Sequence, residues 1–382
     1  MPIPLDLPTL RIIWWVLLGF LLIAFAVTDG FDFGVGMLLH RVAKTDEERR
    51  VVLNTVAPVW EGNQIWFILS GGMIFAAWPE IYAVSFSGFY FAMLLILFAL
   101  ILRPVGFKYR SKITNPRWRA FWDFCLFIGG FVPALIFGVA VGNVLQGVPF
   151  HYDDNLQSYY TGTLIQLLNP FALLCGALSV VMFIMHGGIY LAIKTTHFIQ
   201  YRATKYASVG AILTLVIFAL GGLWIAQGIS GYVLSSPVAW DGPSNPLHKK
   251  VITQMSAWLT NYSTYPMFKL APLCGLIAPI IALILVKLKF YRTALVASAL
   301  SIGGIIATVG LSMFPFILPS SEQPNMSLLL WDASSTRTSL FIMLIAAIVF
   351  IPLILFYTTW IYYVMRGKVT PEYIRDNQKS SY

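Results

Sequence analysis

Long apolar runs alternate with short polar segments along the whole of this 382-residue chain. A helix of about 20 apolar residues is long enough to span the hydrocarbon core of a bilayer. Such runs predict an all-α polytopic membrane protein with about nine transmembrane helices. The predicted spans are Ile12–Leu38, Pro58–Trp78, Tyr82–Leu102, Phe121–Leu145, Leu164–Ile193, Tyr206–Gly228, Met267–Val286, Tyr291–Phe314 and Leu340–Met365.

The composition agrees with a membrane location. Hydrophobic residues make up 58% of the chain and charged residues 11%, and the mean hydropathy is +0.76. Soluble proteins carry about 25% charged residues, so we expect a chain that sits in lipid and has no nucleic-acid partner. The first apolar run lacks a basic leading segment and a small-residue cleavage site, which indicates an uncleaved span.

The basic residues are distributed unevenly between the predicted connections. With the N-terminus outside, 20 of the 25 Lys and Arg residues fall on the cytoplasmic side. The outer side keeps Arg11, Lys249, Lys250, Lys269 and Arg337. Because cytoplasmic loops of membrane proteins are enriched in Lys and Arg, we predict that the N-terminus lies outside and the C-terminus inside.

The segments between the spans differ on the two sides. Three longer outer segments, Gln146–Thr163, Ile229–Pro266 and Pro315–Ser339, are rich in turn-forming residues and predict packed loops with short helices. On the cytoplasmic side, Thr45 and Glu48 have the spacing of a helix capping box. The sequence contains no linker and no strong repeat, so we expect a single integral membrane domain covering residues 1–382.

Two acids lie inside the first predicted span. Asp29 and Asp32 are three residues apart, so they share one face of a helix. Asp29 lies about 25 Å along the helix from Ile12, which places it in the cytoplasmic third of the membrane. Gly30 and Gly34 stand four residues apart beside these acids and predict a close helix crossing.

A third acid, Glu61, opens the second predicted span, one turn in from the cytoplasmic side. Its depth matches that of the acids in the first span, which favours a proton pathway formed by Glu61, Asp29 and Asp32. Two structural interpretations remain open. Glu61 can be a helix-start carboxylate at the water interface, stabilised by the helix dipole. Asp32 can bind the basic loop or Asn54.

The sequence offers little for binding a metal or haem. A membrane haem needs an axial ligand, usually His or Met, inside a span. Of the five histidines, only His186 lies well within a predicted span. It adjoins Gly187 and Gly188, which favours a hydrogen-bonded residue at a helix contact over a haem ligand. We therefore expect no metal and no cofactor bound by this chain itself.

A series of short motifs resembles one known family. In chain order these are R-x-x-W-W (Arg11–Trp15), A-V-T-D-G-F-D (Ala26–Asp32), W-E-G-N-Q-I-W (Trp60–Trp66), F-A-A-W-P (Phe75–Pro79), R-P-V-G-F (Arg103–Phe107), Y-R-S-K (Tyr109–Lys112), G-N-V-L-Q-G-V-P (Gly142–Pro149), L-N-P-F (Leu168–Phe171), M-F-P-F-I-L-P-S-S (Met313–Ser321) and L-W-D-A (Leu330–Ala333). Each motif is weak alone, but the ordered set resembles subunit II of the cytochrome bd ubiquinol oxidases.

The resemblance implies a fold and a location. The family fold is two four-helix bundles plus one peripheral helix in the bacterial inner membrane. Transferred to this chain, residues 1–145 form the first bundle and residues 146–320 the second bundle with its outer loops. Residues 321–365 then hold the peripheral ninth helix, and residues 366–382 form a cytoplasmic tail.

The resemblance also implies an activity that belongs to a complex. The family oxidises quinol and reduces oxygen to water. Subunit I, the expected partner, carries two haems b and one haem d, and subunit II is needed for their assembly. The chain is then an enzyme subunit without a catalytic residue of its own. Lipid, quinone and a small single-helix accessory subunit are further expected partners.

Three residues match family positions with a role. Glu61 corresponds to the acidic position of W-[DE]-G-N-Q, which is associated with a proton route from the cytoplasm. Trp66 corresponds to a tryptophan near an apolar oxygen path towards the partner. Lys108 departs from the family pattern, because some members have an acid there.

A secondary transporter is the alternative function. Intramembrane acids and interrupted helices are typical of substrate and ion sites in transporters. The missing internal repeat speaks against that alternative, whereas the paired acids Asp29 and Asp32 are compatible with it.

Overall fold

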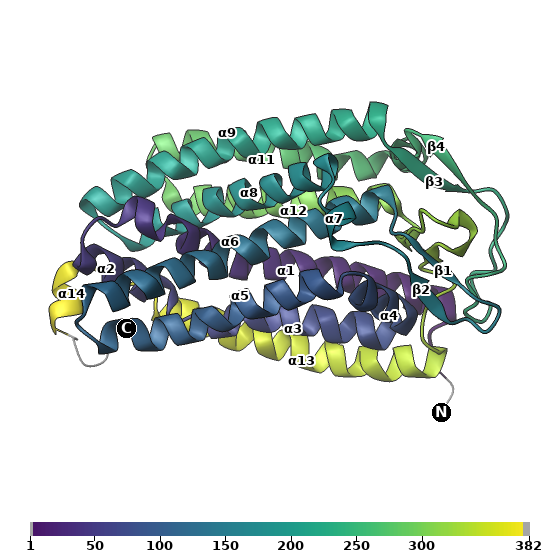
Figure 1. Cartoon of the computed structure of the whole chain (residues 1–382), viewed down its shortest axis with the longest axis horizontal. Helices are drawn as coiled ribbons and strands as arrows, with labels where there is room; N and C mark the ends of the chain where they lie inside the picture. Colours follow the sequence, from purple (N-terminus) through teal and green to yellow (C-terminus); the bar gives the residue numbers. More distant parts are fainter. Residues whose placement is uncertain (1–2, 377–382) are drawn as a thin grey trace.

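The computed structural model describes residues 3–376, and most of them lie in long helices that run side by side (Figure 1). Eight helical segments in this range are long and apolar enough to cross a membrane. They comprise α1 (Leu7–Val42), α5 (Tyr90–Tyr109) with the short 3-10 helix η1 (Arg110–Lys112), α6 (Pro116–Gln146), α8 (Pro170–Lys194), α9 (His197–Gly228), η3 (Pro266–Lys269) with α11 (Leu270–Lys287), α12 (Tyr291–Met313) and α13 (Arg337–Val364). The predicted all-α polytopic class is therefore confirmed.

The other predicted span corresponds to α3 (Trp60–Ala77). With 18 residues, α3 is about 27 Å long, close to the thickness of the hydrocarbon core. Its first turns contain Glu61, Asn63 and Gln64, and α3 is not among the eight segments that are long and apolar enough to cross a membrane. The count of nine spans therefore stays a prediction.

The third predicted span, Tyr82–Leu102, is wrong as a single helix. The chain forms a short α4 (Pro79–Gly88) and then starts α5 at Tyr90, with Phe89 between them outside helical geometry. The ring of Tyr160 packs against Gly88, where a Cβ atom would come within 2.6 Å of it. The missing side chain at Gly88 thus admits an aromatic ring at the break.

Helix α1 lies at the centre of the molecule and contacts α3, α6, α8, α12 and α13. Its closest neighbour in this region is α8: a Cβ atom at Gly34 would lie 2.0 Å from the backbone oxygen of Phe183. The predicted close crossing at Gly30 and Gly34 is confirmed. At the glycine pair of α3, Gly71 and Gly72, an added Cβ atom would have no neighbour within 4 Å among the described residues, so this pair marks no crossing there.

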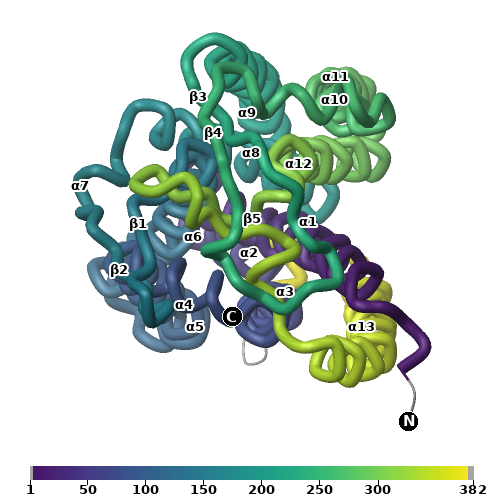
Figure 2. The backbone as a smooth tube through the Cα atoms, turned by 90° about the vertical axis from the view of Figure 1, so that its right-hand side faces the viewer, coloured from purple at the N-terminus to yellow at the C-terminus, as the bar shows by residue number. Residues whose placement is uncertain are grey.

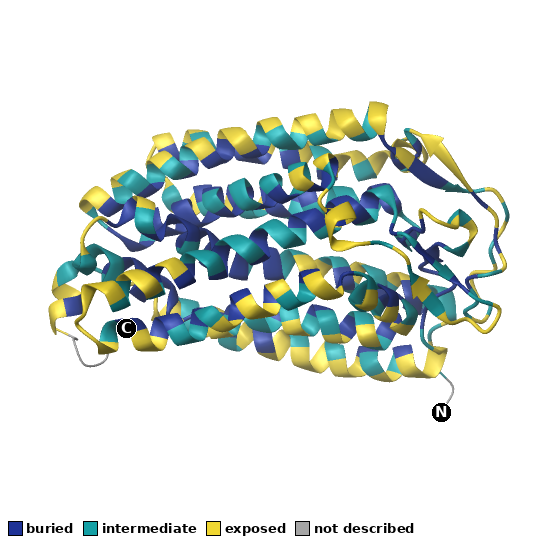
Figure 3. Cartoon of the chain, viewed as in Figure 1, coloured by how far each residue is buried: buried dark blue, intermediate teal, exposed yellow. Residues whose placement is uncertain are grey.

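The remaining helices form two groups around α1. Helices α8, α9, α11 and α12 pack against one another, and α5 packs on α6. Helices α9 and α13 lie on opposite sides of the molecule (Figures 1 and 2). In their most apolar stretches only 17% of the residues are buried, whereas the buried residues of the molecule gather between the helices (Figure 3). The two outermost helices thus present apolar surface to lipid or to another protein.

One end of the molecule, called here the hairpin end, carries three two-stranded antiparallel sheets. The paired strands are β1 (Phe150–Tyr152) with β2 (Ser158–Tyr160), β3 (Ser230–Leu234) with β4 (Val251–Met255), and β5 (Phe316–Leu318) with β6 (Leu328–Leu329). The same end holds the short helices α7 (Leu164–Leu167), η2 (Ala257–Leu259), α10 (Thr260–Thr264) and η4 (Pro324–Met326). The predicted short helices are present, but the sequence did not predict the strands. Backbone N–H and C=O groups that are packed away from water must form hydrogen bonds. In segments too short for long helices, pairing of two strands supplies these hydrogen bonds.

The opposite end, called here the basic end, carries α2 (Asp46–Val56), η1 and α14 (Pro371–Asp376). The capping box of α2 is confirmed: the Glu48 backbone N–H donates to the Thr45 hydroxyl at 3.2 Å, and the Thr45 N–H donates to the Glu48 carboxylate at 3.4 Å. Arg375 of α14 pairs with Glu47 of α2 at 2.7 Å and ties the last described helix to this end.

Candidate functional site

A buried ionic network joins α1 and α5 in the half of the molecule towards the basic end. Arg103 donates two hydrogen bonds to Asp29, from Nη2 to Oδ1 at 2.7 Å and from Nη1 to Oδ2 at 3.1 Å. The same guanidinium lies 3.7 Å from Asp32 Oδ2. It also lies over the ring of Phe33, 4.8 Å from its centroid. The predicted shared face of Asp29 and Asp32 is therefore directed at one cation.

Arg103 corrects a sequence expectation. The sequence places it in a cytoplasmic connection, after a span ending at Leu102. In the structure α5 continues through Pro104 to Tyr109, so Arg103 lies inside the helix with 3% of its surface exposed. A buried guanidinium requires anionic partners, and the acids of α1 supply them. The proline therefore does not end this helix.

Asp32 has less complete hydrogen bonding than Asp29. Its Oδ2 accepts a hydrogen bond from Nδ2 of Asn63 at 2.8 Å, and the hydroxyl of Tyr362 donates to the amide oxygen of Asn63. Asp32 Oδ1 is buried and accepts no hydrogen bond from the described residues. A cavity of about 10 Å³ lies against Asp32 and Arg103, close to the smallest volume that holds one water molecule.

The two predicted alternatives for Asp32 have different outcomes. Asn54 is not its partner, because the Asn54 Nδ2 donates to the backbone oxygen of Arg50 at 2.8 Å. The other alternative was an interaction of Asp32 with the basic loop. Asp32 does lie 3.7 Å from the basic side chain of Arg103, but Arg103 belongs to helix α5 and not to a loop.

Glu61 lies outside this network. Its side chain is exposed on the surface of α3, and within residues 3–376 it makes no ion pair or hydrogen bond. Asn63, two residues further along, points into the network and is fully buried. Residues two apart on a helix face nearly opposite directions, so one short segment supplies both an inward amide and an outward carboxylate. The structure thus does not bring Glu61 together with Asp29 and Asp32.

Trp66 is buried, with 1% of its surface exposed, and packs edge-on against Phe20 at 6.1 Å. Its indole N–H is buried without a hydrogen-bond partner among the described residues. The ring therefore lies in apolar surroundings between α1 and α3.

His186 uses both ring nitrogens in hydrogen bonds. Nε2 lies 2.9 Å from the backbone oxygen of Val27, and Nδ1 lies 2.7 Å from the Ser298 hydroxyl. Because a carbonyl oxygen only accepts, Nε2 carries the proton and donates to Val27. The histidine links α8 to α1 and α12, as expected for a residue at a helix contact.

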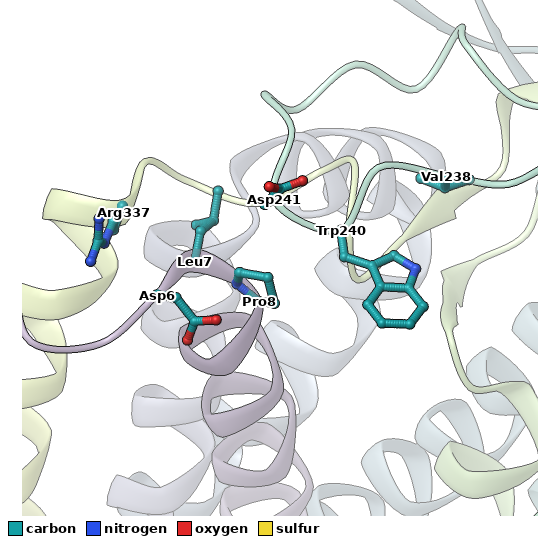
Figure 4. Close-up of a pocket in the computed structure, with 7 residues that line it drawn as sticks. All are labelled: Asp6, Leu7, Pro8, Val238, Trp240, Asp241 and Arg337. Atoms are coloured by element: carbon teal, nitrogen blue, oxygen red, sulfur yellow. The ribbon is translucent and has the colours of Figure 1, made fainter.

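A larger cavity, about 660 Å³, opens at the hairpin end (Figure 4). It is lined by Asp6, Leu7, Pro8, Val238, Trp240, Asp241 and Arg337. Beside it, the buried Arg11 donates to the backbone oxygen of Trp240 at 2.5 Å and to the Ser334 hydroxyl at 2.7 Å. None of the residues of the buried ionic network lines this cavity. The larger cavity and the network around Arg103 therefore lie in different parts of the molecule.

A second buried ion pair stabilises the hairpin end. Lys249 Nζ lies 2.6 Å from Asp332 Oδ2, and both side chains are nearly fully buried. Glu80, at the start of α4, lies near this pair. Its burial is the main cause that raises its pKa above the ordinary 4.5, and the negative charge of Asp332 is the second cause. The L-W-D-A motif thus contributes its acid to loop packing.

The sequence interpretation missed three members of the network: Arg103, Asn63 and Tyr362. Asn63 was visible as a polar residue within an apolar span, and such residues usually have a specific partner. Arg103 had a signal in the two unpaired acids of α1, which required a cation. Tyr362 carried no signal, because tyrosines near the ends of spans are common.

The comparisons with known proteins bear directly on these motifs. The family model described as cytochrome bd terminal oxidase subunit II matches residues 10–365. The chain belongs to this family. It is 49% identical over 378 residues to the cytochrome bd-I ubiquinol oxidase subunit 2 of Escherichia coli strain K12, covering 99% of this chain and 100% of that protein.

One further relative is similar to this chain in sequence, and one solved structure is similar to it in fold. The probable cytochrome oxidase subunit 2 of Haemophilus influenzae is 48% identical, covering 99% of this chain and 100% of that protein. A chain of the bd oxidase structure from Geobacillus thermodenitrificans superposes with a TM-score of 0.67 at 12% identity, covering 94% of this chain and 98% of that one. The latter shows a shared fold. Together with the eight membrane-crossing segments, the relatives establish a multi-pass protein of the bacterial inner membrane and a subunit of an oxidoreductase complex.

Proposed function

We propose that this chain is the haem-free subunit of a quinol:oxygen oxidoreductase and contributes a proton-handling group to it. The proposal rests on the family match over residues 10–365 and, within the chain, on the buried network around Arg103. Two acids and an arginine inside a membrane protein are costly to bury, which favours a functional use over packing alone. No comparable observation favours the transporter alternative.

The partner is subunit I, which holds the two haems b and haem d and oxidises quinol. Both nitrogens of His186 are occupied by Val27 and Ser298, which agrees with haem ligation by the partner. Within the described residues, no group of three or more His, Cys, Asp and Glu side chains is arranged to hold a metal ion. Our proposal assigns this chain the role of supporting haem assembly from its helix faces.

Within the proton-handling network, Asp32 is the group that binds and releases the proton. Both oxygens of Asp29 accept hydrogen bonds from Arg103, and such a bidentate pair fixes the position of the carboxylate. Asp32 keeps one oxygen without a hydrogen bond from the described residues, beside the 10 Å³ cavity. In this proposal Asp29 and Arg103 position Asp32, and Asn63 with Tyr362 orients its second oxygen.

Glu61 is the second proposed proton group, located at the surface of the chain. A carboxylate exposed on a membrane-spanning helix is costly in lipid, so its position favours a face covered by the partner. The exposed Lys108 of α5 lies towards the basic end, and it is the residue that departs from the family pattern described above. We propose that the route through Glu61 lies at the subunit boundary and does not depend on Lys108.

The apolar surroundings of Trp66 support an oxygen path next to it. Oxygen is a small apolar molecule that needs a dry route and no polar binding group. Trp66 contacts Phe20 and lies within the buried apolar core of α1 and α3. This part of the proposal rests on the family position of Trp66 and on the apolar side chains packed around its ring.

The test of the proposed function is haem assembly in membranes. Subunit I is expressed with this chain, without it, and with a His186→Ala variant, and the reduced-haem absorption bands are recorded per subunit I. We expect full bands with the wild type and with His186→Ala, and a loss of bands without this chain. Bands that persist in its absence contradict the assembly role, and loss of one band in assembled His186→Ala contradicts haem placement in the partner.

A further inference from the structure

A second group of buried charges lies at the hairpin end, where α3 ends and α4 begins (Figure 1). Glu80 is the second residue of α4, and its Oε2 atom is buried without a hydrogen-bond partner among the described residues. The hydroxyl of Tyr152, on β1, is near enough to be affected by the charge of Glu80 and is likewise buried without a described partner. A buried carboxylate oxygen that accepts no hydrogen bond disfavours the charged form of its group.

The charged groups that act on Glu80 come from two loops of the hairpin end. Asp332 lies in the loop before α13, Lys249 lies just before β4, and the two form an ion pair at 2.6 Å. Lys249 Nζ also donates to the backbone oxygen of Pro246 at 2.7 Å. The second oxygen of Asp332 accepts from the Leu329 N–H at 2.8 Å. An ionised Glu80 therefore adds a negative charge beside an acid and beside a cation that is already paired.

The loop that holds Asp332 connects the ends of three helices. Ser335 donates its backbone N–H to the oxygen of Ala77, the last residue of α3, at 2.8 Å. The Ser334 hydroxyl accepts from Arg11 of α1 at 2.7 Å, and the positive charge of Arg11 also acts on Asp332. Helix α13 begins directly after this loop. A displacement of Asp332 would therefore reach the hydrogen bonds that hold α1 and α3 to the start of α13.

The titration of Glu80 gives this arrangement a direction with pH. The raised pKa of Glu80 means that its carboxyl binds a proton more strongly in the folded chain than in the unfolded chain. Its contribution to stability is then fully present below the ordinary pKa of 4.5 and is lost as the pH rises through the raised pKa. Burial also raises the pKa of Asp332, against the opposing charge of Lys249, so this acid acts in the same direction.

We propose that Glu80 and the Lys249–Asp332 pair form a pH-sensitive clasp at the hairpin end. When Glu80 is protonated, Lys249 binds Asp332 without competition, and the loop stays fixed on α1 and α3. When Glu80 is ionised, it attracts Lys249 and repels Asp332, so the loop loosens and its hydrogen bond to Ala77 opens more often. The clasp uses none of the residues around Arg103, so it does not rest on the proposed function.

The test is backbone hydrogen exchange of the complex of this chain with its partner, at about pH 5.5 and about pH 8. Protection of the loop 330–336 is measured by mass spectrometry and corrected for the intrinsic pH dependence of exchange. We expect the wild-type loop to be about fivefold better protected at the acid pH. Glu80→Gln should abolish this difference. The control Asp154→Asn, which removes an exposed acid from the same end, should keep it.

Several results would overturn the proposal. One is equal protection at the two pH values in the wild type, and another is a pH difference that persists in Glu80→Gln. Loss of the difference in Asp154→Asn as well means a general effect of surface charge. The same pH difference in peptides of α2, at the basic end, means that the whole molecule loosens. If Glu80→Gln fails to assemble, Glu80→Met replaces it, and the pH difference should again be lost, because Met has a similar volume and no charge.

Discussion

Two aspartates three residues apart on α1 have different surroundings although they share one helix face. Asp29 accepts two hydrogen bonds from Arg103 and is fixed, whereas Asp32 accepts one from Asn63 and keeps its other oxygen unbonded among the described residues. Breaking a buried ion pair leaves an uncompensated charge and costs about 3–5 kcal/mol. Removing a proton-binding group while its hydrogen bonds are kept costs far less stability. The two acids should therefore respond differently to the same substitution.

Asp29→Asn is expected to reduce assembly, because it leaves the Arg103 guanidinium without its main partner. Asp32→Asn is expected to assemble, since its amide oxygen still accepts from Asn63, but to slow oxygen uptake by about tenfold, or about 1.4 kcal/mol. The measurement is steady-state oxygen consumption with excess quinol, on complexes matched for haem. Normal turnover of assembled Asp32→Asn would remove Asp32 from the proton route.

Glu61→Gln tests the surface carboxylate in the same assay. Glutamine still offers an oxygen acceptor at the start of α3 but cannot exchange a proton. We expect Glu61→Gln to preserve assembly and haem content and to slow turnover by about tenfold, with Glu61→Asp retaining more activity. Full turnover in Glu61→Gln assigns Glu61 a structural role as a helix-start carboxylate.

Both members of a residue pair were predictable from the sequence only where they lie close together in the chain. Asp29 and Asp32 follow from their three-residue spacing, and the Thr45–Glu48 capping box follows in the same way. Arg103 is 74 positions from Asp29, and periodicity contains no information on which helices meet. Pro104 also resembled a helix end, although the packed helix α5 accommodates it.

At the scale of elements, small residues decide how closely α1 approaches α8. Gly34 faces the backbone of α8, where a Cβ atom would lie 2.9 Å from the Cα of Gly187 and 2.0 Å from the oxygen of Phe183. No flexible side chain can move to relieve that contact. The crossing therefore depends on both glycines, and α1 meets α8 within one turn of the aspartate network.

Gly34→Ala should force α1 and α8 apart and destabilise the chain by about 1–3 kcal/mol, the usual cost of overpacking. Gly19→Ala is the matched control on the same helix, because a Cβ atom added there would have no described neighbour within 4 Å. The measurement is the thermal unfolding midpoint of the purified complex. Equal midpoints for the two variants would show that the α1–α8 contact is loose enough to adapt.

Element boundaries were predictable where length and apolarity decide them, and less so where packing does. Seven of the predicted spans recur as long apolar helical segments, and the third recurs only from Tyr90 onward. At the break near Phe89, Gly88 packs against the ring of Tyr160, about 70 residues away, and no local pattern contains this contact. The three hairpins likewise form because loop segments meet at one end of the bundle.

At the scale of the whole molecule, two apolar faces, one at α9 and one at α13, are each suited to contact the partner subunit. In the most apolar stretches of α9 and α13, only 17% of residues are buried, and the two helices lie on opposite sides (Figures 1 and 2). Helix α13 lies against α3, and α3 carries the exposed Glu61. A carboxylate facing lipid is costly, whereas one at a protein boundary can be solvated by the partner. We therefore predict that α3 and α13 face subunit I and that α9 faces lipid.

A pair of isoleucines at the middle of their helices tests this assignment. Ile68 of α3 is 67% exposed and Ile212 of α9 is 49% exposed. Lipid adapts its shape around a larger side chain, but a packed protein interface does not, because interface cores are packed as densely as protein interiors. Ile68→Trp should therefore reduce the amount of subunit I that co-purifies with this chain, and of its haem, while Ile212→Trp leaves both unchanged. The opposite result would place the partner on α9 and leave Glu61 facing lipid headgroups or water, which removes the argument for a proton route across the subunit boundary.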